Sequence, residues 1–277
     1  MKRRITILFY AIFLMLGGCK ANGNNNDAIN TTGYMVLIGE DSAIVDKVRD
    51  VDILVIDASY FSKEEIDRLK SNNIDRIYSY LNIGSIENFR SYYADYEEYT
   101  IGDYENWPEE KWIDVSQHEW KEFVLKESIE LSEKGIDGFF IDNVDVYYQY
   151  QNDNIYDGLI DILYDIKTLN KPIIINGGDT FIKKYLESGD ERVLFDGVNQ
   201  ECVYTTYDFI NGCYKKNSKK EKQYFTEYLD MLVENGYLVY VLEYAIDSNI
   251  ADSAYFYAKK HNYICYVSDN IDLQICE

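Results

Sequence analysis

The chain has 277 residues, with 49 acidic against 27 basic side chains and a formal net charge of −22. Such acidity argues against nucleic acid or anionic lipid as a partner and would attract a cationic substrate, although it can also serve solubility alone. No Pro/Gly-rich linker or low-complexity tract interrupts residues 33 to 277, so we expect one large domain, and a monomer.

The amino terminus, "MKRRITILFYAIFLMLGGCK", has a basic start, an apolar run and small residues before a cysteine. This pattern is typical of a secretory signal, and its end resembles a bacterial lipoprotein signal. We therefore expect a signal peptide over residues 1–18, a lipidated Cys19 and a polar tether over 19–32. The protein would then be exported and held outside the cytoplasmic membrane by its lipid alone. An ordinary cleaved signal and an uncut membrane anchor are the alternatives.

Eight short apolar runs rich in β-branched and aromatic residues follow, and each predicts a buried strand. In chain order they are "YMVLIG" from 34, "VDILVIDA" from 51, "RIYSYLNIG" from 76, "DGFFIDN" from 137, "PIIING" from 172, "DGVNQECV" from 196, "YLVYVLEY" from 237 and "YICYVS" from 263.

Stretches with helical periodicity separate these runs. Ser62 precedes Glu65 by three residues and Ser116 precedes Glu119 by three, so both pairs predict a capping box. The helix that begins near Ser116 should end at Gly135. Further helices are expected at about 154 to 169, 179 to 188, 219 to 235 and 249 to 260. Alternating apolar strands and helices indicate a parallel sheet, and eight strands favour a single (β/α)8 barrel over an open doubly wound sheet.

Polar residues stand at the carboxyl ends of six of these strands, where a barrel of this kind places its ligand site. They are Asp57, Asn82, Asp142, Asn176, Glu201 and Glu243. Carboxylates that converge on one mouth can hold different protonation states, which is the chemistry of glycoside hydrolysis. The sequence has only two histidines, which disfavours Ser-His or Cys-His catalysis and histidine-bound zinc.

We expect no cofactor and no metal, although a hard cation held by Asp142 and Asp145 is the remaining competitor. The spacing of the four later cysteines matches no zinc motif. Local disulfides, Cys202 with Cys213 and Cys265 with Cys276, are about as plausible as free thiols.

Five segments follow, in order, the pattern of glycoside hydrolase family 114, which the chain resembles from about residue 33 to 270. They are "YLNIGSIENFRSYY" from 80, "NWPEEKWIDVSQHEW" from 106, "GIDGFFIDNVDVY" from 135, "NGGD" from 176 and "GVNQECVYTTY" from 197. The resemblance implies a TIM-barrel, endo-α-1,4-polygalactosaminidase-like enzyme that acts on galactosamine-containing exopolysaccharide. Ser85 stands where some relatives have a glutamate, which leaves the identity of the sugar open.

The resemblance places the catalytic pair on Asp142, as nucleophile, and Glu201, as general acid/base. Further residues are expected to bind substrate: Asp57, Tyr80, Asn82, Glu87, Arg90, Asp145, Tyr147, Asn176, Tyr204 and Glu243. Tyrosines after both catalytic strands offer flat surfaces for a sugar ring. A lipoprotein that binds a saccharide without cleaving it, or cleaves another glycan, is the alternative.

Overall fold

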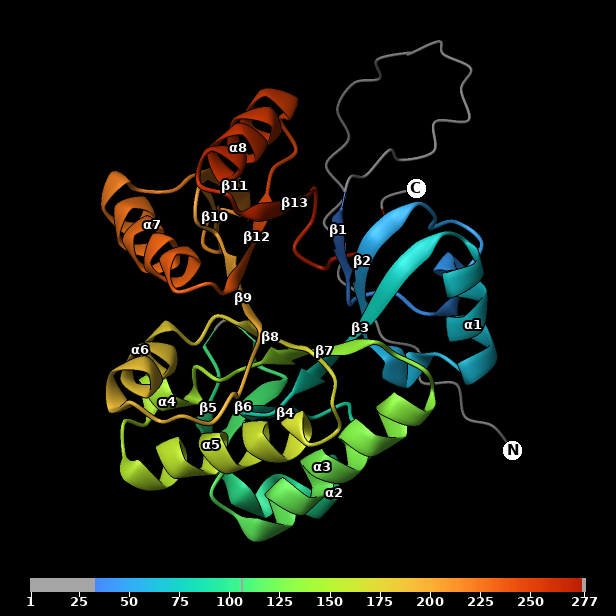
Figure 1. The fold of residues 1–277 in the computed structure, drawn as a ribbon, viewed down its shortest axis with the longest axis vertical. Coiled ribbons are helices and arrows are strands. Elements are labelled where there is room, and N and C mark those ends of the chain that lie inside the picture. The colour runs from blue at the N-terminus through green and yellow to red at the C-terminus, as the bar shows by residue number, and fades with distance from the viewer. Residues whose placement is uncertain (1–32, 106, 276–277) are drawn as a thin grey trace. The chain divides into compact units, whose positions relative to one another are not determined.

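The computed structural model describes residues 33–105 and 107–275. The predicted signal peptide, the lipidated Cys19, the tether and Cys276 lie outside the described residues. Eight parallel strands form one sheet, in the order β1-β2-β3-β7-β8-β9-β12-β13 (Figure 1). They are β1 (Tyr34–Leu37), β2 (Val51–Ile56), β3 (Ile74–Asn82), β7 (Gly138–Asp142), β8 (Ile173–Asn176), β9 (Gly197–Glu201), β12 (Leu238–Tyr244) and β13 (Ile264–Ser268).

The sheet curls into a nearly closed barrel, because its first strand β1 also contacts its last strand β13. Each of the eight predicted apolar runs coincides with one of these strands, although β3 begins two residues before its run, so the predicted (β/α)8 barrel is confirmed. Within the described residues, no helix is long and apolar enough to cross a membrane.

Side chains alternate between the two faces of each strand, and this alternation separates two apolar layers. Residues such as Val36, Phe140 and Leu242 fill the barrel interior, whereas neighbours such as Leu37, Phe139 and Val241 pack outward against the helices. Burial on both faces explains why the strands read as continuous apolar runs.

Among the described residues, six helices of eight or more residues surround the strands, and all six were predicted. They are α1 (Lys63–Ser71), α3 (His118–Glu133), α5 (Asp153–Lys167), α6 (Asp179–Ser188), α7 (Lys219–Glu234) and α8 (Ser248–Lys260). The capping box at Ser62 is formed, and Gly135 ends α3 with a φ of 98°. The predicted capping box at Ser116 is wrong. Its hydroxyl donates to Asp114, and α3 begins after Gln117 with no side-chain cap.

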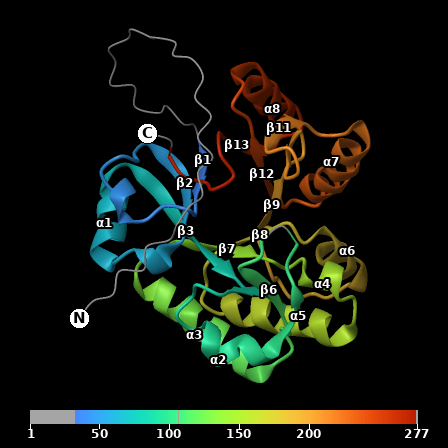
Figure 2. The ribbon, with the colours of Figure 1, turned by 180° about the vertical axis from the view of Figure 1, so that it is seen from behind.

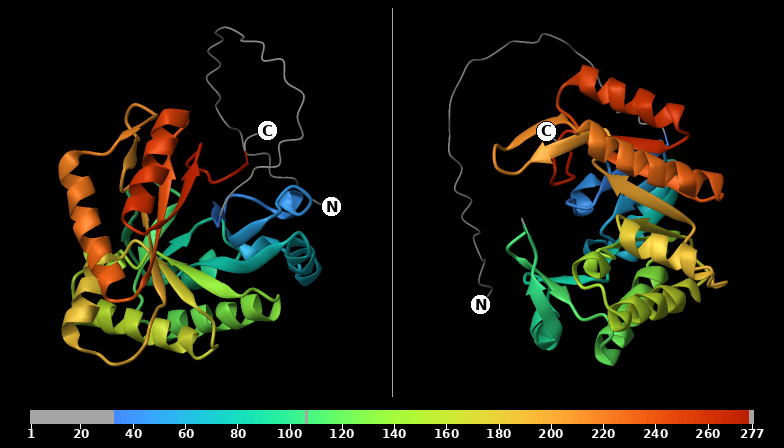
Figure 3. Two further views of the ribbon diagram at one scale, coloured as in Figure 1. Left: turned by 45° about the horizontal axis from the view of Figure 1, so that its top comes forward. Right: turned by 90° about the vertical axis from the view of Figure 1, so that its left-hand side faces the viewer.

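Short elements inserted after strand ends were not predicted. After β3 come β4 (Ser85–Glu87), α2 (Tyr93–Tyr96), β5 (Thr100–Asp103) and β6 (Glu110–Ile113). After β7 comes α4 (Val146–Gln149), and after β9 come β10 (Thr205–Asp208) and β11 (Cys213–Lys216). The strands β4, β6 and β5 form a small antiparallel sheet, and β10 pairs with β11. Figures 2 and 3 show that both sets branch from the ends of barrel strands.

Candidate active site

A carboxylate pair lies at the carboxyl ends of β7 and β9, bridged by an amide from the strand between them. The Asn176 side-chain nitrogen, at the end of β8, donates to Asp142 Oδ1 and to Glu201 Oε1, each at 2.9 Å. An amide nitrogen carries two hydrogens spread by about 120°, so a separate hydrogen for each carboxylate corresponds to acceptor oxygens about 5 Å apart. Neighbouring strands of one sheet therefore bring together three residues far apart in the sequence.

Asp142 has an environment that favours proton uptake. Its pKa is raised to about 6, first by burial and then by the charge of Glu201. Hydrogen bonds from the Asn176 amide, the Asn143 backbone and the Tyr80 hydroxyl act in the opposite direction, because they stabilise the ionised form. Near pH 6, the Asp142 carboxyl therefore lies close to the point at which it gains or loses a proton.

Glu201 receives a second donor from Tyr244, the last residue of β12. The Tyr244 hydroxyl donates to Glu201 Oε2 at 2.5 Å. Burial and the nearby Glu201 charge raise the pKa of Tyr244 well above its ordinary value, so the phenol keeps its proton. Both oxygens of Glu201 are thus bonded, one to Asn176 and one to Tyr244.

A third carboxylate, Glu110 on β6, was not predicted. Its Oε1 accepts from Asn82 at 3.0 Å, from Asn143 at 2.9 Å and from the Ser85 hydroxyl. Burial raises the pKa of Glu110 to about 7, with Asp142 among the charges that add to it. Glu110 ends no barrel strand, because the inserted sheet sets its position. The only sequence signal was its place inside a segment that resembles the family.

Several carboxylates influence the pKa of the Tyr104 hydroxyl. This hydroxyl donates to Asn143 Oδ1 at 2.9 Å. Burial raises its pKa above the ordinary value, and four carboxylates raise it further. They are Asp142, Glu110, Asp145 and Glu201. Four acidic side chains therefore act together on this hydroxyl.

Asp145 supports the loop after Asn176. It accepts a hydrogen bond from the Gly178 backbone at 3.0 Å, and burial raises its pKa to about 7. Gly177 and Gly178 both have left-handed backbones, with φ of 67° and 72°. A Cβ on Gly177 would lie 2.4 Å from Asp145 Oδ2, so glycine is required for the carboxylate to approach. This contact holds the backbone that carries Asn176.

Arg90 lies between two buried carboxylates beside Tyr80. It pairs with Asp57 at 2.8 Å and with Glu87 at 3.1 Å. Burial disfavours the charged guanidinium, but the two carboxylates outweigh it and raise its pKa. Glu87 Oε2 and Arg90 Nε are buried and have no hydrogen-bond partner among the described residues. Charges of both Glu87 and Arg90 act on the Tyr80 hydroxyl, so this ion-pair cluster borders the site.

Three predicted substrate-binding residues lie away from the pair. Glu243 is 1 % exposed, and its carboxylate accepts from the Tyr204 and Thr205 backbones and the Thr205 hydroxyl. The ring of Tyr204 packs on Tyr257, with centroids 5.3 Å apart. Tyr147 is buried against Tyr156 on the helix side of the barrel. The alternation of side chains along a strand explains why Glu243 lies away from the pair. Tyr244 has the interior-facing position, so its neighbour must face outward.

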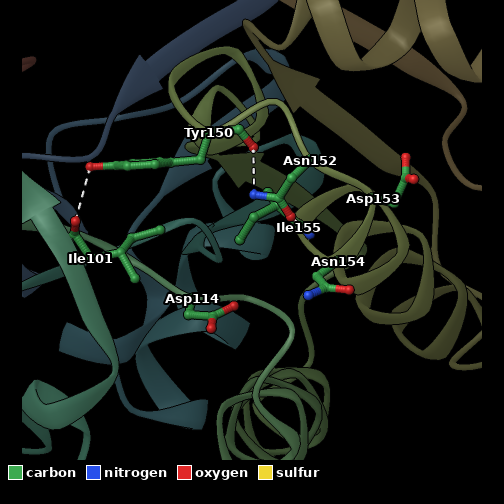
Figure 4. A pocket seen from close by; sticks show the side chains of 7 residues that line it. All are labelled: Ile101, Asp114, Tyr150, Asn152, Asp153, Asn154 and Ile155. Carbon is green, nitrogen blue, oxygen red and sulfur yellow. Dashed lines mark hydrogen bonds between the residues drawn. The ribbon is translucent and has the colours of Figure 1, made fainter.

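A separate surface pocket of about 370 Å³ does not include the carboxylate pair. Figure 4 shows its lining, in which the Tyr150 hydroxyl donates to the Ile101 carbonyl at 3.2 Å. The lining residues are Ile101, Asp114, Tyr150, Asn152, Asp153, Asn154 and Ile155. In the part of the chain that the structure describes, no group of three His, Cys, Asp or Glu side chains is placed to hold a metal. Cys202, Cys213 and Cys265 are free thiols.

A (β/α)8 barrel with paired carboxylates at the carboxyl ends of its strands is an architecture that glycosidases use. Residues 20–274 match the model of glycoside-hydrolase family GH114, so the chain belongs to this family and is a glycosidase. A comparison with curated proteins gives no significant match.

Solved structures with a similar fold include two from bacteria and one from a fungus. The glycoside hydrolase domain of PelA from Pseudomonas aeruginosa has a TM-score of 0.70 at 16 % identity, covering 88 % of this chain and 95 % of that one. Aspergillus fumigatus Ega3, in complex with galactosamine, has a TM-score of 0.65 at 19 % identity, and the match covers 93 % of this chain and 98 % of that one. An α-galactosidase from Thermus thermophilus has a TM-score of 0.55 at 9 % identity, and the match covers 87 % of this chain and 58 % of that one.

Proposed function

We propose that this glycosidase hydrolyses galactosamine-containing polysaccharide with α-1,4 linkages, using Asp142 and Glu201. The observation that carries the proposal is the Asn176 amide bonded to both carboxylates at 2.9 Å. The family match supports the reaction class, and the galactosamine bound by the similar fungal structure supports the sugar.

The spacing of the pair favours a mechanism that retains the anomeric configuration. Retaining glycosidases have carboxyl groups about 5 to 5.5 Å apart, whereas inverting enzymes need about 6.5 to 9.5 Å to admit a water. In the proposed reaction, Asp142 attacks the anomeric carbon while Glu201 protonates the departing glycosidic oxygen. Glu201 then removes a proton from water, which attacks the glycosyl–Asp142 ester and releases the sugar and the free carboxylate.

The electrostatics of the mouth suit a polymer with free amines. Four carboxylates act on the Tyr104 hydroxyl, and the nearby guanidinium of Arg90 is already paired with Asp57 and Glu87. An ammonium group that enters this site gains Coulomb energy in a partly desolvated environment. Of the residues predicted to bind substrate, Tyr80, Asn82, Asp145 and Asn176 lie closest to this chemistry, and Glu110 joins them.

The proposal is tested by incubating the domain from residue 33 onward with partly deacetylated α-1,4-galactosaminan. Shorter oligomers should appear on size analysis, and proton NMR of the first products should show the α-anomer before mutarotation. A fully acetylated polymer serves as the matched substrate and should be cleaved more slowly. Tight binding of the oligosaccharides with no cleavage would show a saccharide-binding module and reject the enzyme.

Activity is expected to decline as pH rises through about 6. The reactive pair must hold a single proton, and the pKa of Asp142, raised to about 6 by burial and by Glu201, marks the loss of that proton in the free enzyme. Loss of this proton leaves the pair without the shared proton that is passed to the glycosidic oxygen. The profile of kcat/KM between pH 4 and 9 checks this, and a profile that rises through pH 6 would contradict it.

We also propose that the protein is exported and anchored through a lipid on Cys19. The lipoprotein-like sequence before Cys19 supports this, and the family match begins at residue 20. Expressed in bacteria fed a fatty-acid analogue, the full chain should incorporate the label and remain with membranes. Cys19→Ser should abolish the label, whereas Cys213→Ser should leave it unchanged. Equal labelling of the Cys19→Ser variant would refute the anchor.

A further inference from the structure

A chain of buried hydrogen bonds connects the carboxylate pair with the barrel interior. The Asn199 side-chain nitrogen, on β9, donates to Asn176 Oδ1 at 2.7 Å. The Tyr34 hydroxyl, on β1, donates to Asn199 Oδ1 at 3.1 Å. Asn199 has no exposed surface and Tyr34 is 1 % exposed. Neither residue was predicted from the sequence to take part in the site.

The barrel interior gives these polar groups few other partners. Asn199 lies opposite Asn176 in the register of β8 with β9, and beside them the interior is filled by side chains such as Ile174 and Leu242. A buried amide group that lacks a hydrogen-bond partner destabilises the folded protein, so each donor and acceptor is strongly tied to its partner.

The direction of these bonds is determined by chemistry. When both carboxylates are ionised they only accept hydrogen bonds, so in that state Asn176 presents its nitrogen to Asp142 and Glu201 and turns its oxygen away. That oxygen needs a donor, which is the Asn199 nitrogen. The Asn199 oxygen then needs a donor of its own, which is the Tyr34 hydroxyl. Burial raises the pKa of Tyr34 well above its ordinary value, so this hydroxyl keeps its proton.

We propose that Asn199 and Tyr34 are positioning residues that hold the Asn176 amide in the orientation in which its nitrogen bridges the two catalytic carboxylates. The proposal rests on the proposed function only in calling the carboxylates catalytic. In the opposite orientation, the amide oxygen would face both carboxylates. Each would then lose a donor to its ionised form, and the pair would hold its proton to higher pH.

The hydrogen bonds that run from Tyr34 through Asn199 to Asn176 are called the relay here. Two substitutions and a matched control test it. Asn199→Leu removes the donor to Asn176, and Tyr34→Phe removes one hydroxyl only. Tyr240→Phe removes a hydroxyl from a ring that packs on Tyr34, with centroids 4.9 Å apart, and that lies outside the relay. The three proteins and the parent are compared by thermal unfolding, by carbon-13 NMR titration of the Asp142 carboxyl, and by kcat and KM on the galactosamine polymer.

The Asp142 titration should move to higher pH in Asn199→Leu, and by less in Tyr34→Phe, while Tyr240→Phe leaves it unchanged. With KM nearly constant, kcat should fall about tenfold in Asn199→Leu and a few-fold in Tyr34→Phe, as expected for the loss of buried hydrogen bonds. Tyr34→Phe carries the test alone should the leucine variant not fold.

An Asp142 titration unchanged in the relay variants, or shifted equally in Tyr240→Phe, would overturn the inference. The NMR titration needs no substrate, so its result stands even when the parent protein does not cleave the polymer. In that case the proposed function fails, and the relay is judged separately by the titration.

Discussion

Asp142→Asn and Glu201→Gln are each expected to lower kcat on the polymer by about a thousandfold or more. Both changes keep the shape of the side chain and its bond to Asn176, but remove the proposed nucleophile or the proposed proton donor. Thermal stability should be kept, because each change also removes one of two like charges that lie close together. Initial rates and melting temperatures measured on the same preparations check both statements.

Asp137→Asn is the matched control, since it makes the same chemical change at the opposite end of the same strand. Asp137 pairs with Lys70 at 2.8 Å and accepts from the Ile77 backbone at 2.9 Å, so its loss should affect stability and not turnover. Full activity in both Asp142→Asn and Glu201→Gln would refute the mechanism.

Rescue by azide separates the two roles. In Asp142→Ala, azide in the vacated space should attack the anomeric carbon directly and form a glycosyl azide of inverted configuration. In Glu201→Ala, azide should attack the covalent intermediate and form the azide of retained configuration. The reverse pattern would exchange the roles of the two residues.

Arg90→Met is expected to lower the free energy of unfolding by about 3 to 5 kcal/mol, the usual cost of removing one partner from a buried ion pair. The side chains of Asp57 and Glu87 are only 5 % and 8 % exposed, so the variant leaves two buried carboxylates without their counter-charge. Urea unfolding monitored by circular dichroism measures the difference.

Two further variants show whether burial of the ion pair causes the expected loss of stability in Arg90→Met. Arg90→Lys keeps the charge but loses the forked geometry that reaches both carboxylates, so its loss should be intermediate. Arg68→Met breaks an ion pair with Asp46 in which the side chains are 56 % and 83 % exposed, and it should have little effect. A loss in Arg90→Met no larger than that in Arg68→Met would contradict the expectation.

Local patterns in the sequence were sufficient to predict the barrel. Apolar runs such as "PIIING" are buried on both faces of a parallel sheet. The helix start at Ser62 and the helix end at Gly135 depend only on residues close by in the sequence. The failed cap at Ser116 shows the limit of such signals. Asp114, two residues earlier, competes for the same hydroxyl.

Strand order alone brings together three of the residues that the sequence singled out. Asp142, Asn176 and Glu201 each end a strand, and β7, β8 and β9 are neighbours in the sheet. The sequence did not reveal which of two adjacent residues faces the mouth. Glu243 was chosen for its carboxyl group, but Tyr244 has the interior-facing position and contacts Glu201.

The sequence by itself determined the (β/α)8 barrel, the strand ends that carry polar residues and the family, because these depend on local pattern and residue type. Only the tertiary structure decided the Asn176 bridge between the two carboxylates, the approach of Glu110 and the hydrogen bonds from Tyr34 through Asn199. These features depend on contacts between residues many positions apart. Such contacts are set by sheet closure and loop packing, which no short stretch of sequence encodes.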